Sequence, residues 1–270
     1  MDKYLVVGNP IAQSKSPVIH GLFAQETQQN MMYSKELIAV DDFKGAIENF
    51  ISSGVKGINV TAPFKEQAFE LCDELSEFAA KAGAVNTLIF KDGAIYGDNT
   101  DGVGLVNDLI NHNVELSGKS IVLLGAGGAS KGVVSAMLAE QPAKLTIANR
   151  SVEKAQSIAE LYPDQVSACR LEELADIQAD IVINATSAGL NGQSLNIPSN
   201  IFHEQTICYD MTYGKALTPF LTFAKNSGSK QLIDGLGMLV EQAAQSFYIW
   251  RGVKPSTDGV ISQLREQMSL

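Results

Sequence analysis

The sequence predicts an α/β protein that is built as two domains. Strand-like and helix-like patterns alternate along almost all of its 270 residues, and strands that alternate with helices form parallel sheets with right-handed crossovers. The length suits two domains of ordinary size. A run of turn-forming residues at 97–102 (Gly-Asp-Asn-Thr-Asp-Gly) interrupts the pattern. We therefore expect the boundary between the domains there.

The first half of the chain begins with a predicted strand at Lys3–Val7, which the turn Gly8-Asn9-Pro10 ends. Ser16-Pro17 is typical of a helix N-cap followed by proline at the first helical position. The elements expected next are a strand at 34–40, a helix opened by Asp41-Asp42, a strand at 56–60, helices at 65–72 and 74–81, and strands at 84–90 and 94–96.

The second half repeats a strictly alternating pattern after a connecting helix at 103–110. Strands are expected at 119–124, 144–149, 165–169, 180–184, 206–210 and 230–233, with helices at 129–140, 151–161, 171–176 and 217–226 and a long turn after 184. Two last helices, from Met238 and after Pro255-Ser256, exceed what such a sheet needs. We expect them to return to the first domain, which gives domains at 1–101 plus 238–270 and at 102–237.

The strand at 119–124 leads into a glycine-rich turn and then a helix. Glycines allow the backbone to turn sharply and to approach a pyrophosphate, toward which the following helix directs its free N–H groups. This predicts a Rossmann-like, doubly wound dinucleotide-binding domain, although the third fingerprint position holds serine. The alternative is a tight strand–helix turn that binds nothing. The residues concerned are Gly125, Ala126, Gly127, Gly128, Ala129 and Ser130.

The next strand ends at Asn149, Arg150 and Ser151. Proteins that bind NAD usually carry an acid about there, ~20 residues after the glycines, to accept a hydrogen bond from the ribose 2′-hydroxyl. This chain has none and offers a guanidinium and small polar groups, which suit a 2′-phosphate. The pattern therefore predicts NADP, with a solvated arginine as the alternative interpretation.

Polar clusters in the first half stand where strands end. They include Ser14 and Ser16 after the first strand, and Asn59 and Thr61 at the end of the third. The further members are Asn86 in the fourth strand and Asp101 before the connecting helix. Because the carboxyl ends of parallel strands converge, these groups could line one pocket for a carboxylate or hydroxyl groups. Taken singly, each has a structural explanation as a cap or a ladder side chain.

Lys65 is the clearest catalytic candidate, because it follows a proline turn among these polar groups. A lysine can donate a proton to a carbonyl oxygen as hydride arrives, and a carboxylate such as Asp101 can hold the ammonium group charged and oriented. The alternative is an exposed lysine in the first turn of a helix, which is an unfavourable place for a positive charge.

The composition narrows the classes of function. Hydrophobic residues make up 45% of the chain and the net charge is −10, which favours a globular protein and argues against partners such as nucleic acid or a membrane surface. Neither a signal peptide nor a membrane span is predicted. Three separated cysteines indicate a reducing compartment, and we expect a cytoplasmic protein. The three histidines, of which His20 is the one of interest, show no metal-ligand spacing, so no metal is expected.

Taken together, these motifs resemble the quinate/shikimate dehydrogenase family nearly end to end. The matching segments, with Ala62 in place of the usual valine, are 8–17, 59–65, 83–87, 97–102, 125–130, 184–187 and 234–240. The resemblance implies that Lys65 is the catalytic acid/base and Asp101 its partner. It further implies that Ser14 and Ser16 bind the substrate carboxylate, and that Asn59, Thr61, Asn86, Asp101, Tyr213 and Gln242 bind the rest of the substrate.

For the cofactor, the resemblance implies that residues 125–130 hold the pyrophosphate. Asn149, Arg150, Ser151 and Lys154 would bind the adenosine 2′-phosphate, although the family usually has threonine and arginine at the last two positions. Lysine is a point charge without the planar fork of arginine, so the strictness of the NADP preference stays open. The residues implied near the rest of the cofactor are Thr186, Met211, Gly235 and Glu77.

The implied function is the reversible, NADP-dependent reduction of 3-dehydroshikimate to shikimate in aromatic amino-acid biosynthesis. Hydride would pass between the nicotinamide and ring carbon 3 across a cleft between the domains. Two alternatives stay open: a broader quinate/shikimate enzyme that accepts NAD, and a non-catalytic NADP-binding sensor of metabolites. The oligomeric state, a homodimer included, is also open.

Overall fold

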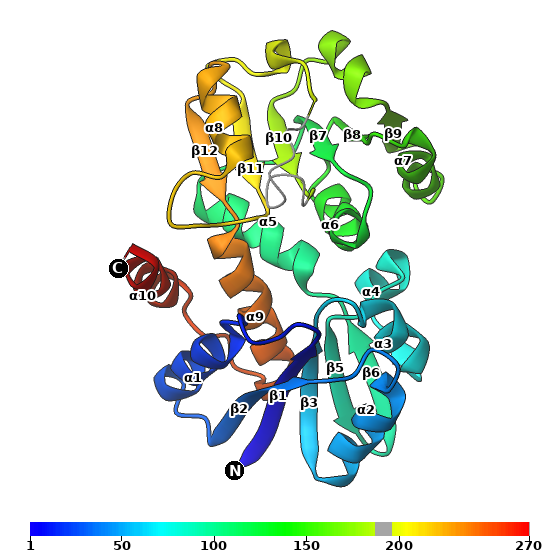
Figure 1. Ribbon diagram of the computed structural model, residues 1–270, viewed down its shortest axis with the longest axis vertical. Helices are drawn as coiled ribbons and strands as arrows, with labels where there is room; N and C mark the ends of the chain where they lie inside the picture. The colour runs from blue at the N-terminus through cyan, green and yellow to red at the C-terminus, as the bar shows by residue number, and fades with distance from the viewer. Residues whose placement is uncertain (187–195, 270) are drawn as a thin grey trace. The chain divides into compact units, whose positions relative to one another are not determined.

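The chain forms two α/β units, shown in the computed structural model of Figure 1, which describes residues 1–186 and 196–269. The first unit comprises Met1–Gly104 and Leu239–Gln263, and the second comprises Leu105–Met238 and Leu264–Leu270. The expected α/β fold class is confirmed, with a mixed sheet in the first unit and an all-parallel Rossmann-like sheet in the second.

The sheet of the first unit has the strand order β2-β1-β3-β5-β6-β4. Its strands are β1 (Asp2–Gly8), β2 (Met31–Leu37), β3 (Val55–Val60), β4 (Glu74–Leu75), β5 (Thr87–Lys91) and β6 (Ala94–Asp98). β5 runs antiparallel to β3 and to β6, whereas β1 pairs in parallel with β2 and β3. The carboxyl ends of β1, β3 and β6 therefore meet the beginning of β5 at one edge.

Helices cover both faces of this sheet. One face packs against α2 (Phe43–Ser52), α3 (Lys65–Leu71) and α4 (Glu77–Ala82), with buried residues such as Ile47, Ala68 and Ala79. The other face carries α1 (Ser16–Glu26) and α9 (Leu236–Arg251), whose Phe23 and Phe247 rings meet edge to face. Successive strand residues point to opposite faces, so each strand contributes to both layers.

Three local predictions were wrong, and tertiary pairing explains two of them. Residues 74–75 form the short strand β4, because the N–H groups of the flanking residues Asp73 and Ser76 donate to the carbonyls of Ile95 and Gly97 in β6. β5 begins three residues later than expected, because Val85 N–H bonds to the carbonyl of Lys65 instead of a strand. β2 is shifted toward the N-terminus, and its register against β1 begins at Met31.

The second unit has the strand order β12-β11-β10-β7-β8-β9, and every neighbouring pair is parallel. The strands are β7 (Ser120–Leu124), β8 (Lys144–Ala148), β9 (Val166–Cys169), β10 (Ile181–Asn184), β11 (Ile207–Asp210) and β12 (Gln231–Asp234). The helices are α6 (Gly128–Ala139), α7 (Val152–Ala159) and α8 (Pro219–Asn226), with 3-10 turns η1 (Leu171–Asp176) and η3 (Ser199–Ile201). The expected helix at 171–176 is thus a 3-10 helix, and residues 187–195 of the long turn after 184 lie outside the described residues.

Three helices belong in part to each unit: α5 (Asp101–Asn111), α9 and α10 (Asp258–Ser269). The expected return of α9 to the first domain is confirmed, since Trp250 Nε1 donates to the carbonyl of Leu88 at 3.1 Å. The end of α10 groups instead with the second unit, where Arg265 donates two hydrogen bonds to Asp234. Within residues 1–186 and 196–269, no helix is long and apolar enough to cross a membrane.

Candidate functional site

The polar clusters of the first unit meet at the sheet edge where β1, β3 and β6 end. Asn86 lies directly before β5, not inside a strand as expected, and reaches this edge because β5 runs antiparallel to its neighbours. Its carbonyl accepts the N–H of Val60, the last residue of β3. The convergence expected from parallel strands is therefore achieved partly by an antiparallel one.

Lys65 and Asp101 form an ion pair at this edge. Lys65 Nζ lies 2.5 Å from Asp101 Oδ2, and the side chains are 30% and 15% exposed, respectively. Lys65 is the first residue of α3, and Phe64 before it is buried and stacks on Phe43, which holds the start of the helix against the sheet. The ammonium group is thus fixed by a carboxylate while part of it stays accessible to a ligand.

Asn86 binds the other oxygen of the same carboxylate. Its Nδ2 donates to Asp101 Oδ1 and to Thr100 Oγ1, both at 2.9 Å, and its Oδ1 accepts the backbone N–H of Thr100 at 2.9 Å. Asn86 is only 3% exposed. Since each oxygen of Asp101 holds a different donor, the carboxylate acts as a bridge between Asn86 and Lys65.

Ser14, Ser16 and Thr61 lie beside the ends of β1 and β3. Ser14 Oγ accepts the backbone N–H of Ser16 at 3.3 Å, so Ser14 supports the start of α1. The expectation that Ser16 is the N-cap was wrong, because Ser16 is the first residue of the helix and Lys15 precedes it as the cap. Thr61 is partly exposed, and its N–H bonds to the carbonyl of Val7.

Asn59 and Gln242 differ in burial, although the amides of both donate hydrogen bonds, that of Gln242 to the carbonyl of Leu239 at 2.8 Å. Asn59 is buried, and its amide bonds to Tyr33, Thr87 and Ser246. Gln242 lies on α9 and is partly exposed; a Cβ on Gly104, one turn after Asp101, would meet the Gln242 backbone nitrogen at 2.8 Å. Gln242 therefore lies next to the helix that carries Asp101, while Asn59 is committed to internal contacts.

The glycine turn of the second unit has the geometry of a phosphate cradle. Gly125 has φ +103°, which disfavours other residues, and a Cβ there would also meet Thr186. Gly127 and Gly128 would each meet nothing within 4 Å, and with Ala129 they are exposed at the N-terminus of the 12-residue helix α6. Ser130 is buried and donates to the Gly125 carbonyl at 2.8 Å, so serine at this position closes the turn.

The predicted 2′-phosphate residues follow the neighbouring strand. β7 and β8 are paired in parallel up to Leu124 and Ala148, which places the glycine turn and residues 149–151 at the same edge. Asn149 Nδ2 donates to the Ser151 carbonyl at 2.9 Å and shapes the loop. Arg150 and Lys154 are exposed. Two exposed cations beside the cradle, with no acid in residues 149–151, fit the additional phosphate of NADP.

The remaining predicted residues of this unit, which are the cofactor candidates Thr186, Met211 and Gly235 and the substrate candidate Tyr213, stand at the ends of β10, β11 and β12. Asn184 Oδ1 accepts from the hydroxyl of Thr186 at 2.7 Å, whereas Ser187, the last residue of that motif, lies outside the described residues. Gly235 lies so close to the Met211 carbonyl that no side chain would fit. Tyr213 follows β11, and burial raises the pKa of its phenol. All of these residues lie at the carboxyl edge, where ligands of doubly wound sheets bind.

Glu77 is the one predicted cofactor residue that lies in the first unit. It opens α4, its side chain is 78% exposed, and it pairs with Lys81 at 2.6 Å. The hydrogen bond from Lys81 lowers the pKa of this carboxyl. The structure does not bring Glu77 together with the glycine turn within one unit.

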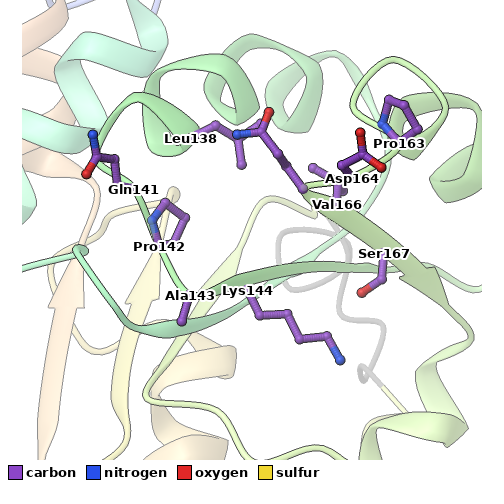
Figure 2. Close-up of a pocket in the computed structure, with 10 residues that line it drawn as sticks. Leu138, Gln141, Pro142, Ala143, Lys144, Pro163, Asp164, Val166 and Ser167 are labelled. Carbon is purple, nitrogen blue, oxygen red and sulfur yellow. The ribbon is translucent and has the colours of Figure 1, made fainter.

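A depression of about 420 Å³ on the second unit lies at the opposite edge of the sheet (Figure 2). It is lined by Lys144 and Val166, the first residues of β8 and β9, together with Pro142 and Pro163. Ligands of such sheets bind at the carboxyl ends of the strands, so this depression is not the dinucleotide site. The described residues also contain no cluster of three or more histidine, cysteine, aspartate or glutamate side chains that could hold a metal ion.

The sequence interpretation did not assign roles to several buried polar residues behind these sites. In the first unit they are Thr87, Thr100 and Ser246, with the partly buried Tyr33 beside them; in the second they are Asn184, Asp210 and Thr218. Ser246 offered a signal, because it interrupts the apolar face that Ala243, Ala244 and Phe247 give to α9. The others look like ordinary strand or cap residues until their partners are known.

Three family models cover most of the chain. Residues 6–88 match the shikimate dehydrogenase substrate binding domain, residues 108–192 match shikimate / quinate 5-dehydrogenase, and residues 235–265 match the shikimate 5′-dehydrogenase C-terminal domain. Among curated proteins, shikimate dehydrogenase (NADP(+)) of Colwellia psychrerythraea is 52% identical over 268 residues, which cover 99% of this chain and 98% of that protein.

Solved structures agree with this similarity over the full length. An Ael1 enzyme from Pseudomonas putida superposes with a TM-score of 0.94 at 46% identity and covers 98% of both chains. Shikimate 5-dehydrogenase from Thermus thermophilus in complex with NADP(H) and shikimate superposes with a TM-score of 0.88 at 29% identity, over 98% of this chain and 99% of that one. On the strength of its fold, its motifs and these full-length matches, the chain belongs to the shikimate dehydrogenase family.

Proposed function

We propose that this chain catalyses the reversible, NADP-dependent reduction of 3-dehydroshikimate to shikimate. The observation that carries the proposal is the Lys65–Asp101 pair, partly exposed at a sheet edge that also holds Ser14, Ser16, Thr61 and Asn86. The names of the curated relatives support the reaction, and the T. thermophilus relative was solved with NADP(H) and shikimate.

In this proposal the first unit binds the hydroxylated acid and the second binds NADP. The hydroxyls of Ser14 and Ser16 hold the substrate carboxylate, and Thr61, Asn86, Asp101 and Gln242 hold the ring hydroxyls. Tyr213, which belongs to the second unit, stays a prediction for a residue that binds a ring hydroxyl. Bound NADP(H) supplies or accepts the hydride at ring carbon 3. Lys65 gives its proton to the carbonyl oxygen during reduction and takes it back from the hydroxyl during oxidation, while Asp101 keeps the ammonium group in place.

Asn59 and Glu77 are proposed with smaller roles. The Asn59 amide is bonded to Tyr33 and to the buried Ser246 and therefore shapes the substrate pocket from behind. Glu77 is exposed on α4 and stays a prediction for a residue near the cofactor. A homodimer stays a prediction as well.

One spectrophotometric assay tests the proposal. The chain should produce NADPH, seen as an increase of absorbance at 340 nm, from shikimate and NADP⁺, and should react more slowly with NAD⁺ or with quinate. Equal rates with the two cofactors and both acids would favour the broader quinate/shikimate enzyme. No absorbance change, combined with measurable NADP⁺ binding by calorimetry, would favour the non-catalytic sensor.

A further inference from the structure

A compact group of buried hydroxyls and amides lies directly behind the Lys65–Asp101 pair. Thr87 and Ser246 are fully buried, and their hydroxyl oxygens are 2.8 Å apart. Thr87 Oγ1 is also 2.8 Å from Asn86 Oδ1 and 3.2 Å from Asn59 Nδ2. Burying polar groups costs free energy unless each of them finds a partner. The question is therefore which donor faces which acceptor in this group.

Groups that can only donate or only accept determine the orientation of Asn86. The backbone N–H of Thr100 can only donate, and it lies 2.9 Å from Asn86 Oδ1. The carbonyl end of the Asn86 amide must therefore face Thr100, and its NH₂ end must face Asp101, where Nδ2 lies 2.9 Å from Oδ1. The Thr87 hydroxyl donates to the same Asn86 oxygen and reinforces this orientation.

The same reasoning orients Asn59. The backbone carbonyl of Asn86 can only accept, and Asn59 Nδ2 donates to it at 3.1 Å. Asn59 Oδ1 must then accept from the Tyr33 hydroxyl, which lies 2.7 Å away. The second N–H of Asn59 is left for the two hydroxyls, with Ser246 Oγ at 3.0 Å and Thr87 Oγ1 at 3.2 Å.

Ser246 joins this group to α9. Because the Thr87 hydroxyl gives its one proton to Asn86, Ser246 donates its own proton to Thr87 Oγ1 at 2.8 Å. The carbonyl of Gln242, one turn earlier on the helix, lies 3.1 Å from Ser246 Oγ, and Thr100 Oγ1 lies 3.3 Å from it. The turn of α9 that presents Gln242 is thereby tied to the residues that orient Asn86. One hydroxyl thus connects two predicted substrate positions that come from opposite ends of the sequence.

We infer that Thr87 and Ser246 are positioning residues for the reaction. Their paired hydroxyls hold the amides of Asn59 and Asn86, and through Asn86 they hold the Asp101 carboxylate against Lys65. This inference rests on the proposed function and adds to it two side chains that touch neither substrate nor cofactor. Small errors in the placement of a reacting group cost large factors in rate.

The experiment compares variants that separate the hydroxyl from the shape of the side chain. Thr87→Val keeps the shape and removes the hydroxyl, Thr87→Ser keeps the hydroxyl, and Ser246→Ala removes the other member of the pair. Thr206→Val, at a fully buried threonine of the second unit, is the matched control. For each variant the steady-state constants with shikimate, the NADP⁺ dissociation constant and the midpoint of thermal unfolding are measured, and activity is assayed well below that midpoint.

We expect Thr87→Val to lower kcat/KM for shikimate about ten- to a hundredfold and Thr87→Ser to stay within about threefold of the wild type. Ser246→Ala should fall between them, and the double variant should lose less than the product of the single losses. NADP⁺ affinity should not change, and Thr206→Val should keep wild-type kcat/KM.

The inference is overturned if Thr87→Val matches the control in kcat/KM, if Thr87→Ser is as impaired as Thr87→Val, or if the effects of Thr87→Val and Ser246→Ala simply multiply. If Thr87→Val does not fold, Ser246→Ala and Thr87→Ser decide by the same criteria. A wild-type protein that does not oxidise shikimate would instead contradict the proposed function, so the two failures are distinguishable.

Discussion

Asp101 gives each of its carboxylate oxygens a different partner, and this keeps the Lys65 ammonium group both held and accessible. Asn86 occupies Oδ1 and Lys65 occupies Oδ2. The pair is partly exposed, so its value for stability is small, and its arrangement is better explained by the chemistry it makes available. Two predictions belong to this scale.

Replacing Lys65 by alanine should remove the proton donor and leave the substrate contacts of the other residues. We expect kcat to fall by ~10²–10⁴, the usual contribution of a positioned acid or base, while shikimate binding measured by calorimetry is retained. Lys44→Ala, which breaks an exposed lysine–glutamate pair in the same unit, should keep full turnover. Near-normal turnover of Lys65→Ala would exclude Lys65 from the mechanism.

Replacing Arg150 by alanine tests the predicted 2′-phosphate site. The loss should weaken NADP⁺ binding by about 1.5–3 kcal/mol, the scale of a hydrogen bond to a charged group, and should leave NAD⁺ binding nearly unchanged. Fluorescence titration with NADPH and NADH measures both. Lys144→Ala, at the opposite edge of the sheet, controls for the loss of one positive charge. If affinity for both cofactors falls equally, Arg150 has a structural role.

At the scale of elements, both sites depend on how strands deliver residues to one edge. In the first unit, β5 reaches the edge by its beginning and β6 by its end, because they form an antiparallel pair. In the second unit, the parallel register of β7 with β8 and β10 aligns the glycine turn with residues 149–151 and with Thr186. The turn before α6 gives a third prediction.

Two glycine substitutions in this turn should have different consequences. Gly125→Ala places a side chain at φ +103° and should destabilise the protein by about 1–2 kcal/mol. Gly127→Ala has φ −94° and open space around its Cβ, so stability should stay within about 0.5 kcal/mol, while NADPH affinity falls because the methyl group occupies the cradle. Chemical unfolding and NADPH titration measure the two effects. Unchanged affinity in Gly127→Ala would place the pyrophosphate elsewhere.

At the scale of the whole molecule, the acidic net charge of −10 means that an anionic cofactor must be bound by local cations and helix N–H groups. The stability of the fold also depends on charge, through His20. This ring is fully buried and stacks on Tyr33 with 4.1 Å between ring centroids. Burial lowers the pKa of His20 to about 3.

The pH dependence of unfolding follows from that shift. Between pH 6.5 and 3 the unfolded chain binds a proton at His20 and the folded chain does not, so stability decreases as pH falls. His20→Phe should remove this contribution and reduce the loss of unfolding free energy between pH 7 and pH 5 by about 2 kcal/mol at most. Urea unfolding at both pH values measures it, with His203→Gln as a control at an exposed histidine. Equal losses in the wild type and His20→Phe would show that His20 is accessible to protons when folded.

Much of this architecture is predictable from local sequence. The apolar run at 121–124, the glycines after it and the alternating pattern beyond them predict the parallel sheet and its cradle, because strand, turn and helix each depend on residues close in sequence. Single-residue features such as Ser130 could be noticed but not explained, since the hydroxyl that closes the turn finds its acceptor only in the folded loop.

The sequence by itself determined the fold class, the family and the identities of the candidate residues, because these follow from patterns a few residues long. Only the tertiary structure decided that β5 is antiparallel, that Asp101 bridges Asn86 and Lys65, and that Ser246 meets Thr87 across 159 positions. Those contacts join segments far apart in the chain, and their geometry depends on sheet register and helix packing, which no local pattern specifies.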